Sequence, residues 1–337
     1  MLYLYILFSL LLVTLQGTQG AEKKRVEEVE DEIGYIQSLV LNTPAIASVK
    51  SSYQDIEVYE SSHFGKVFLL DECLQLTERD APHYNEMLAH VPMMEYMASY
   101  ATNPEPMRVL VLGGGDGYVV SELLKYPLIE SIDHVELDVE VINISKKHFK
   151  WASAWEHEKV NLVIGDGAAF VEKQAKEGNS YHVIIQDASD PFYTDSDGSV
   201  VTLPSHVLYK DAHFKMMHTL LQPKKGVLMF QAETYNIPSN LEEIRKWRHS
   251  LEKIGFENVR YGSISISTYP TGQIGFFASH VHDDGEEMVC KSNTCKDNSF
   301  ADDNMNTLDW IDWNRILTSF QELSGETKYY HPRIHRR

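Results

Sequence analysis

Apolar residues follow two different periods along this chain, and the change of period divides it into two parts. Residues 54–59 alternate between apolar and polar side chains, and two more short strands are predicted at residues 66–70 and 74–77, separated by Asp71 and Glu72. Alternation with period two is typical of strands that bury one face. We therefore predict a small antiparallel sheet over about residues 45–80, with a short helix before it over residues 27–41.

From residue 82 onward the pattern is that of helices alternating with strands. Residues 84–100 predict a helix with a Met-rich face that we expect to pack in the core: Met87, His90, Val91, Met94 and Met97. Five strands separated by helical segments are expected next, at residues 108–112, 131–137, 160–164, 182–186 and 227–231. This order predicts a mostly parallel sheet with helices on both faces. Residues 261–267 and 274–278 have no helix between them and predict a closing antiparallel hairpin.

The chain is therefore expected to have four parts. These are a signal peptide at 1–20, an N-terminal helix and small sheet at 21–82, a Rossmann-like α/β domain of the class I methyltransferase type at 83–282, and a polar segment at 283–337. The last part contains an acidic loop or insertion and a predicted helix over residues 310–321.

The N-terminus carries an apolar run from Leu2 to Leu15 that is too short to cross a membrane comfortably. Small residues follow it, with Thr18 and Gly20 where a signal peptidase would cleave. We expect a secretory signal peptide and a secreted or secretory-pathway protein. Two alternatives stay open: an uncleaved signal anchor, because no Lys or Arg precedes the run, and a cytoplasmic protein if the signal is not used.

Composition limits the classes of molecule that are expected as partners of this chain. The formal net charge of -19 disfavours nucleic acid and anionic membranes, so neither is expected as a partner once the signal is removed. The acidity suits a cationic small molecule, or it only keeps the protein soluble. Cys290 and Cys295 could close a disulfide loop in an oxidising compartment. Cys73 is expected to be a buried thiol, and the three cysteines predict no metal site.

Glycines follow the first strand of the expected parallel sheet, at Gly113, Gly114, Gly115 and Gly117, with Asp116 among them. A strand that ends in glycines and opens a helix is typical of a cofactor-binding turn. Tyr118 stands where a dinucleotide site would have glycine, which favours an adenosine without phosphates.

Acidic residues close the next two strands. Glu136 can accept both hydrogen bonds of a ribose diol, and Asp166, beside Gly167, can bond an adenine amino group. Asp138 and Asp166 could instead be helix caps.

Two carboxyl groups follow the fourth strand, at Asp187 and Asp190. Alkylation of an amine needs such groups, because the amine is an ammonium at neutral pH and must lose a proton before it attacks. One carboxylate can take this proton and the other can hold the distant cationic end of a diamine. The alternative is a turn capped by these two residues.

Several stretches, taken together, resemble the polyamine aminopropyltransferases of the spermidine synthase type. They are residues 52–55, 74–80, 84–87, 113–117, Glu136, 165–167, 187–191, 268–276 and 328–330. The resemblance implies transfer of an aminopropyl group from decarboxylated S-adenosylmethionine to putrescine, giving spermidine and methylthioadenosine. It implies no permanently bound cofactor, no metal, a polyamine substrate and a homodimer.

The resemblance also implies roles for individual residues. Asp187 would be the catalytic acid that activates the amine, and the amine would be bound by Asp190, Tyr84, Tyr269 and Gln231. The aminopropyl donor would be bound by Gln54, Gln75, Gly113, Gly115, Asp116, Glu136, Asp166 and Gly167. Three departures stand out. Tyr118 replaces a glycine, Asn85 replaces a glutamine or histidine, and residues 192–202, before Pro204, are an insertion.

Three functional hypotheses follow. The first is an active aminopropyltransferase, with spermidine or a longer amine as an alternative acceptor that would make it a spermine or thermospermine synthase. The second is an S-adenosylmethionine methyltransferase on the same fold, which the acidic lining disfavours because that donor carries a carboxylate. The third is a secreted protein that binds polyamines or nucleosides without turnover.

Overall fold

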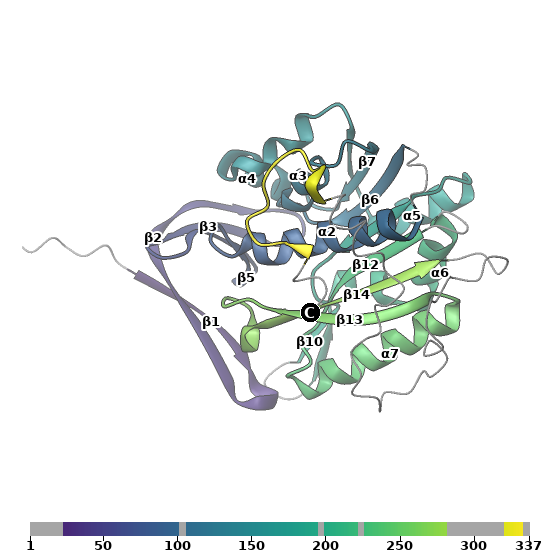
Figure 1. The fold of residues 1–337 in the computed structure, drawn as a ribbon. Coiled ribbons are helices and arrows are strands. Elements are labelled where there is room, and N and C mark those ends of the chain that lie inside the picture. The colour runs from purple at the N-terminus through teal and green to yellow at the C-terminus, as the bar shows by residue number, and fades with distance from the viewer. Residues whose placement is uncertain (1–22, 101–105, 195–198, 222–225, 282–319, 333–337) are drawn as a thin grey trace, which may run out of the picture.

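The computed structural model describes residues 23–100, 106–194, 199–221, 226–281 and 320–332. They form a small antiparallel sheet beside an α/β unit built on a seven-stranded, mostly parallel sheet (Figure 1). The predicted fold class is confirmed. The signal peptide, the Cys290 and Cys295 pair, and nearly all of the helix predicted over 310–321 lie outside the described residues.

The small sheet has the strand order β1-β2-β3-β4-β5, and every neighbouring pair is antiparallel. Its strands are β1 (Lys23–Glu30), β2 (Tyr35–Lys50), β3 (Asp55–Ser61), β4 (Gly65–Leu70) and β5 (Cys73–Thr77). The three strands predicted at residues 54–59, 66–70 and 74–77 are confirmed as β3, β4 and β5. Phe68 of this sheet meets Phe149 edge-on, with ring centroids 6.0 Å apart, and so helps to dock the sheet on the α/β unit.

The helix predicted over residues 27–41 is wrong, because these residues form the β1–β2 hairpin. The hairpin turns through a short 3-10 segment, η1 (Asp31–Ile33), and Gly34, whose φ of 63° is left-handed. Glycine adopts this conformation freely and ends a helix. Beyond the turn, Tyr35 to Leu41 pair in register with β1. The cross-strand pairing therefore overrides the helix propensity of the Glu-rich segment.

The large sheet has the order β13-β14-β12-β9-β6-β7-β8. Its parallel strands are β6 (Met107–Gly113), β7 (Ile129–Glu136), β8 (Val160–Ile164), β9 (Val183–Asp187) and β12 (Gly226–Ala232). The closing pair, β13 (Glu257–Ser265) and β14 (Gln273–Val281), is antiparallel as predicted. Strand β6 lies between β9 and β7, so the chain reverses its direction of winding at this strand. Ligands of open α/β sheets bind at the carboxyl ends of strands beside such a point.

Helices cover both faces of this sheet, as predicted. Helices α2 (Ala81–Tyr100) and α3 (Tyr118–Leu123) pack in one core cluster with the sheet, and α6 (Asp211–Leu220) and α7 (Pro238–Ile254) pack in another. The remaining segments are α4 (Val139–His148), α5 (Gly167–Lys176), η2 (Lys150–Glu156), η3 (Pro204–Tyr209) and η4 (Pro270–Gly272). The predicted Met-rich face of α2 is buried in the core, which confirms its packing role.

Two smaller expectations can be compared with the structure. Within residues 192–202, which were expected to be an insertion, β10 (Phe192–Thr194) pairs antiparallel with β11 (Val200–Thr202). This pairing returns the chain beside its starting point, so Leu203 N–H donates to the Pro191 carbonyl at 2.9 Å. Cys73 is exposed rather than buried, so that expectation is wrong. It is the first residue of β5, immediately after a turn, where the apolar strand pattern does not guarantee burial.

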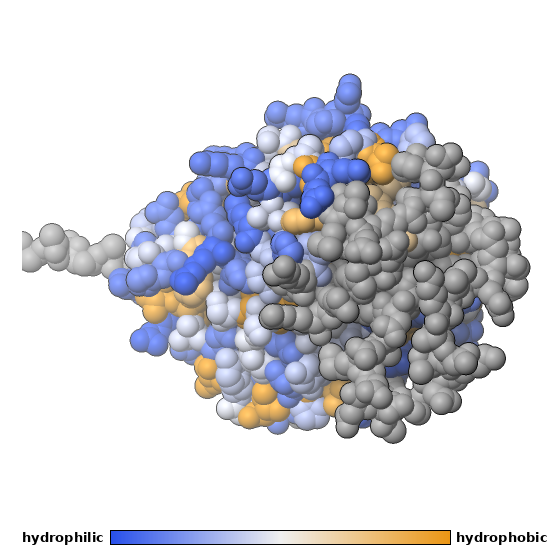
Figure 2. Space-filling view, in the orientation of Figure 1, coloured by the Kyte–Doolittle hydropathy of each residue, from blue (hydrophilic) through white to orange (hydrophobic). Residues whose placement is uncertain are grey.

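Among the coloured residues on the face shown in Figure 2, most of the surface is hydrophilic, with separate apolar groups. Several exposed apolar side chains belong to the β1–β2 hairpin: Val29, Ile33, Ile36, Val40 and Ile46. None of the helices in the described ranges is both long and apolar enough to cross a membrane.

Candidate active site

The glycine turn after β6 is the centre of the site. Gly113, Gly114 and Gly117 have φ values of 76°, 70° and 82°, which residues with a side chain rarely adopt. A Cβ added at Gly113 would lie 2.2 Å from the main-chain oxygen of Asp187, and one at Gly114 would lie 2.7 Å from Asp187 Oδ2. Glycine is therefore required here for the turn to touch the end of β9.

A buried histidine supports this turn from below. His134 Nε2 donates to the Gly113 carbonyl at 2.6 Å, and its Nδ1 accepts from Trp155 Nε1 at 2.8 Å. Burial lowers the pKa of His134 to about 4, so the ring is neutral and its proton is on Nε2. The two rings stack with an interplanar angle of 4°. Sequence reasoning missed this support, although His134 lies in a buried strand two residues before Glu136.

The group formed by Gln54, Asp116, Glu136 and Asp138 is called the nucleoside end here. Glu136 Oε1 accepts from Asp138 N–H at 2.9 Å, which leaves Glu136 Oε2 beside Gly115. Asp138 caps α4 and accepts from Gln54 Nε2 at 3.1 Å. Gln54, which lies in the small sheet's β2–β3 connection, is thereby held against the end of β7. These residues were predicted to lie together, apart from Asp138, which was expected to be a cap.

Asp166 lies at the end of β8 and also acts as a helix cap. Its Oδ1 accepts from Ala168 N–H at 2.7 Å and from Ala169 N–H at 3.1 Å. The side chain is exposed, and Gly167 begins α5 immediately after it. The alternative reading of Asp138 and Asp166 as caps is therefore correct in geometry. The cap occupies only one oxygen of Asp166, so the other stays open toward a ligand.

Asp187 links the glycine turn to the stacked rings of Tyr84 and Tyr269. Tyr84 Oη donates to Asp187 Oδ1 at 2.6 Å. Tyr84 also stacks on Tyr269, with ring centroids 5.8 Å apart, and Tyr269 Oη donates to the Gln75 carbonyl at 3.0 Å. The structure thus brings the predicted residues Tyr84, Tyr269 and Gln75 into one connected group around Asp187.

Asp190, Gln231 and Glu233 form a second acidic group beyond Asp187. Gln231 Nε2 donates to Asp190 Oδ1 at 3.0 Å, and Gln231 Oε1 accepts from Tyr209 Oη at 2.8 Å. The Asp190 and Glu233 carboxyl groups hydrogen-bond to each other, which requires a proton between them. Sequence reasoning missed Glu233 and Tyr209. The position of Glu233, just beyond the end of β12, was the signal that could have found it.

Burial raises the pKa of five carboxyl groups in the site: Asp116, Glu136, Asp187, Asp190 and Glu233. It raises the pKa of Asp187 to about 6 and that of Glu136 to about 7. It raises the pKa of Asp116 to about 8, with the neighbouring Asp187 charge as the next cause. Asp190 keeps contact with solvent, yet the protein on its other sides also raises the pKa of its carboxyl. The pKa of Glu233 is raised well above its usual range, first by burial and then by Asp190.

These shifts separate the roles of the two central acids. Near neutral pH, Asp116 keeps its proton while Asp187 loses its own, so one carboxylate and one neutral acid face each other. In the described residues, none of Asp116, Asp187, Asp190 and Glu233 pairs with a Lys or Arg. The site therefore attracts cations. The described part of the chain contains no cluster of three or more His, Cys, Asp or Glu side chains that could hold a metal ion.

A buried acid outside the site ties its segments together. Asp80, between β5 and α2, accepts hydrogen bonds from Thr77 Oγ1 and, at 2.5 Å, from Thr268 Oγ1. Thr268 directly precedes Tyr269. Asp80 therefore fixes the β13–β14 connection, and with it Tyr269, to the start of the helix that carries Tyr84.

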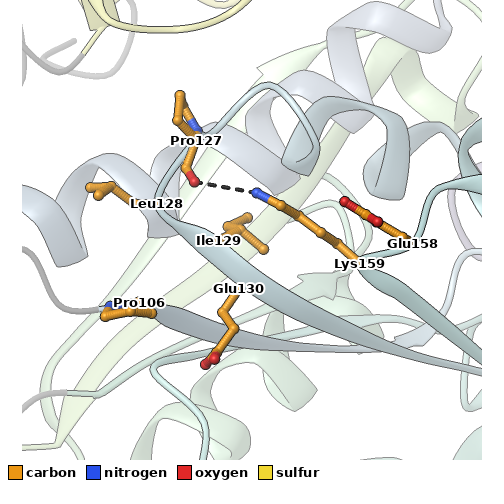
Figure 3. Close-up of a pocket in the computed structure, with 7 residues that line it drawn as sticks. All are labelled: Pro106, Pro127, Leu128, Ile129, Glu130, Glu158 and Lys159. Atoms are coloured by element: carbon orange, nitrogen blue, oxygen red, sulfur yellow. Dashed lines mark hydrogen bonds between the residues drawn. The ribbon is translucent and has the colours of Figure 1, made fainter.

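A separate surface depression of about 560 Å³ lies at the opposite edge of the sheet (Figure 3). Its lining includes Ile129 at the start of β7 and Lys159 just before β8, and Lys159 Nζ donates to the Pro127 carbonyl at 3.3 Å. It contains none of the predicted site residues. We therefore place the site at the carboxyl edge.

Substitution of Gly113 by alanine tests the close approach of the turn to Asp187. We expect Gly113→Ala to weaken binding of methylthioadenosine at least about tenfold, because its Cβ would meet main-chain atoms that cannot move aside. Calorimetric titration measures the affinity. Gly178→Ala is the matched control, since Gly178 has a similar φ of 73° but no atom within 4 Å of an added Cβ. Equal affinities of the two variants would contradict the role given to this contact.

Comparisons with known proteins agree on one family. Residues 81–287 match the spermine/spermidine synthase domain, and residues 48–78 match the spermidine synthase tetramerisation domain. The chain is 37% identical to spermidine synthase 2 of Arabidopsis thaliana over 236 residues, which are 67% of this chain and 61% of that protein. It is 36% identical to putrescine N-methyltransferase 2 of Nicotiana tabacum over 228 residues, which are 67% of this chain and 58% of that protein.

The chain thus matches less than two thirds of the length of these two relatives. The fold is shared with a crystal structure of spermidine synthase in complex with the transition-state analogue AdoDATO, at a TM-score of 0.71 and 24% identity, over 95% of this chain and 94% of that one. The family model alone spans more than half of the sequence. The chain belongs to the spermine/spermidine synthase family.

Proposed function

We propose that this protein transfers an aminopropyl group from decarboxylated S-adenosylmethionine to putrescine, giving spermidine and methylthioadenosine. The observation that carries the proposal is the position of Asp187. Its carboxyl group touches the glycine turn on one side and is followed, on the other, by the Asp190 and Glu233 pair. A base therefore lies between a nucleoside site and a site for a second cation.

The nucleoside end suits the aminopropyl donor. Glu136 Oε2 is available to the ribose hydroxyls, and Asp166 at the rim is available to the adenine amino group. Gln54 and Gln75 lie on the small sheet's side of the site and would contact the nucleoside and its aminopropyl arm. The donor carries a sulfonium and an ammonium but no carboxylate, so the carboxyl groups at Asp116 and Asp187 favour it. No resident cofactor or metal is needed.

At the acidic end, Asp187 would accept the proton that the attacking ammonium must lose. The freed amine then attacks the methylene carbon beside sulfur. The new N–C bond forms as the C–S bond breaks, and the electron pair of the C–S bond stays on the sulfur of methylthioadenosine. Asp190, with Gln231, would hold the far ammonium of the diamine, while the stacked Tyr84 and Tyr269 rings would line its methylene chain. Alignment and deprotonation are the contributions of the protein.

Methyl transfer to putrescine is the second candidate, because a relative of similar identity is a putrescine N-methyltransferase. The acidic end fits the same diamine in both reactions. The donors differ, since S-adenosylmethionine carries a carboxylate that decarboxylated S-adenosylmethionine lacks. The ionised carboxylate of Asp187 disfavours an additional negative charge, which supports aminopropyl transfer.

The reaction is tested by incubating the mature protein, from Ala21 onward, with each of the two donors and a panel of amines. We expect methylthioadenosine release from the decarboxylated donor with putrescine. Release only with spermidine would instead indicate a spermine or thermospermine synthase, and N-methylputrescine from S-adenosylmethionine would indicate the methyltransferase. A folded protein that binds the ligands but turns over none of them would be a non-catalytic binding protein.

Replacement of the proposed base separates chemistry from binding. We expect Asp187→Asn to lower turnover at least about a thousandfold, because the amide cannot accept the ammonium proton. Methylthioadenosine should still bind with nearly unchanged affinity, which calorimetry measures. Asp166→Asn is the comparison variant and should chiefly raise the donor KM. Unchanged turnover in Asp187→Asn would refute the proposed mechanism.

The pH dependence follows from the raised pKa of Asp187. Asp187 must be ionised to act as a base, so turnover should be full above its pKa and should fall as the pH decreases through about 6. An ordinary aspartate would lose activity only about two units lower, near pH 4. Initial rates at saturating amine and donor, in overlapping buffers, measure this acid limb. Constant turnover down to pH 5 would contradict the assignment.

We also propose that the protein is a homodimer or a larger homo-oligomer. The match of residues 48–78 to a tetramerisation domain indicates assembly. The apolar side chains exposed on the β1–β2 hairpin, which include Val29, Ile36 and Val40, lie in the same small sheet and suit such a contact. Sedimentation analysis of the mature protein would distinguish a dimer from a tetramer.

Entry into the secretory pathway is a further proposal, and Asn143 offers a way to test it. Asn143-Ile144-Ser145 is the one Asn-x-Ser/Thr sequence in the chain, and Asn143 is exposed on α4. This sequence accepts N-linked glycans in that compartment. Expressed with its own N-terminus in secretory cells, the protein should begin at Ala21 and carry a glycan that Asn143→Gln removes. Mass spectrometry that finds Met1 and an unmodified Asn143 would place it outside the pathway.

A further inference from the structure

The C-terminal tail, defined here as residues 324–331, returns to the α/β unit and packs beside α2 and α3. Figure 1 shows this yellow segment in front of both helices. Ser324 N–H donates to the Lys125 carbonyl at 2.9 Å, just beyond α3. Lys125 Nζ in turn donates to the Glu326 carbonyl at 2.6 Å. The entry of the tail is therefore fixed to the end of α3.

The tail is bound to α2 through a fully buried acid. Glu86 has no solvent exposure, and its two carboxyl oxygens accept from three consecutive main-chain N–H groups. Lys328 N–H donates to Oε1 at 2.7 Å, and Tyr329 and Tyr330 N–H donate to Oε2 at 2.7 and 2.6 Å. Within the described part of the chain, Glu86 has no Lys or Arg partner. The amides of the tail are thus what compensates the burial of this acid.

Aromatic rings add to this contact on both sides of Glu86. Tyr330 is buried, with its ring centroid 5.0 Å from that of His90. The Tyr329 ring lies 4.2 Å from the ring of His83. His83 directly precedes Tyr84, so the tail touches α2 on each side of the residue that bonds Asp187.

Helix geometry gives Tyr84 and Glu86 opposite directions. Successive residues of an α-helix are turned by about 100°, so side chains two residues apart point to nearly opposite sides. Tyr84 points into the site and donates to Asp187 at 2.6 Å, while Glu86 points to the tail. This part of α2 therefore lies between the tail and the reaction centre.

We infer that the tail and Glu86 form a clasp that positions Tyr84 against Asp187. Glu86 is a positioning residue, because it touches neither substrate nor the reacting atoms. The inference rests on the proposed function for its main readout. Loosening the clasp would let α2 move and would lengthen the hydrogen bond from Tyr84, while the fold, held by the core of the sheet, would remain.

The sign of the expected pH effect distinguishes positioning from electrostatics. The titratable groups that face Asp187 are Tyr84, Asp116, Glu136, Tyr209 and Tyr269, and none of them belongs to the tail. Tyr118 lies close enough to Glu86 for that acid to contribute to the raised pKa of its phenol. The bond from Tyr84 lowers the pKa of Asp187, so its loss raises that pKa. Removal of the Glu86 charge alone would lower it, because a negative charge disfavours ionisation of a nearby acid.

The test uses Glu86→Gln in the mature protein. The glutamine amide has the same shape as the carboxylate, but its NH2 group cannot accept the hydrogen bonds that the main-chain N–H groups of the tail donate to Glu86. We expect kcat to fall about tenfold or more with little change in the donor KM. The acid limb of kcat should move to higher pH, as it does in Tyr84→Phe. The double variant that combines Glu86→Gln with Tyr84→Phe should show no further shift of the acid limb, since both changes remove the hydrogen bond from Tyr84 to Asp187. Glu326→Gln makes the same chemical change on an exposed tail residue and should behave as wild type.

Several results would overturn the inference. They are an acid limb that stays in place or moves to lower pH in Glu86→Gln, or shifts that add in the double variant. If Glu86→Gln does not fold, Thr327→Val replaces it, because this change removes only the bond from Thr327 Oγ1 to the Tyr330 carbonyl within the tail. It should give a smaller shift in the same direction, and no shift would reject the clasp.

If the proposed function is wrong, the wild-type protein will turn over no amine, and this result is obtained before any variant is compared. The clasp would then be tested by proton exchange on putrescine binding, measured calorimetrically in buffers of different ionisation enthalpy. The pH at which Asp187 exchanges its proton should still rise in Glu86→Gln and in Tyr84→Phe. An unchanged pH in Glu86→Gln would reject the clasp independently of catalysis.

Discussion

The arrangement of the whole site depends on one backbone contact, between the glycine turn after β6 and the end of β9. These parallel neighbours place Gly113 opposite Asp187, and the missing Cβ lets the two main chains touch. Strand β6 lies between β9 and β7. The contact therefore places Asp187 at the end of β9 and Glu136 at the end of β7 on two sides of a single turn. The nucleoside end and the acidic end are therefore held together by the same residues that form the sheet.

The concentration of acids at this edge opposes folding and favours binding for the same reason. Burial raises the pKa of Asp116, Glu136 and Asp187, so each ionised carboxylate is less stable here than in water. The Asp190 and Glu233 pair reduces this cost by sharing a proton. A cationic ligand supplies the missing counter-charge, and its binding stabilises the folded state by an amount that grows with the logarithm of ligand concentration above Kd. The property that is unfavourable in the empty protein is the one that favours binding of a cation.

The sequence was sufficient for the parts of this structure that follow from order along the chain. Strand ends of a parallel sheet share an edge, so the positions of Glu136 at the end of one strand and of Asp187 and Asp190 at the end of another already placed them together. Long-range pairing was not predictable in this way. The β1–β2 hairpin reads locally as a helix, and only its cross-strand register decides otherwise. Tyr209 and the amides that bind Glu86 have no local signal, because their partners are distant in sequence.

The reaction centre is assembled from segments that are connected through buried acids rather than through sequence proximity. Asp80 joins the end of the small sheet to the connection that carries Tyr269, and Glu86 joins the C-terminal tail to the helix that carries Tyr84. Tyr84 and Tyr269 stack on each other, so the two acids act from opposite ends on one pair of rings. A buried carboxylate that bonds hydroxyl or amide donors has a narrow range of favourable geometry. Asp80 and Glu86 can therefore set the spacing of the Tyr84 and Tyr269 rings without contacting either ring.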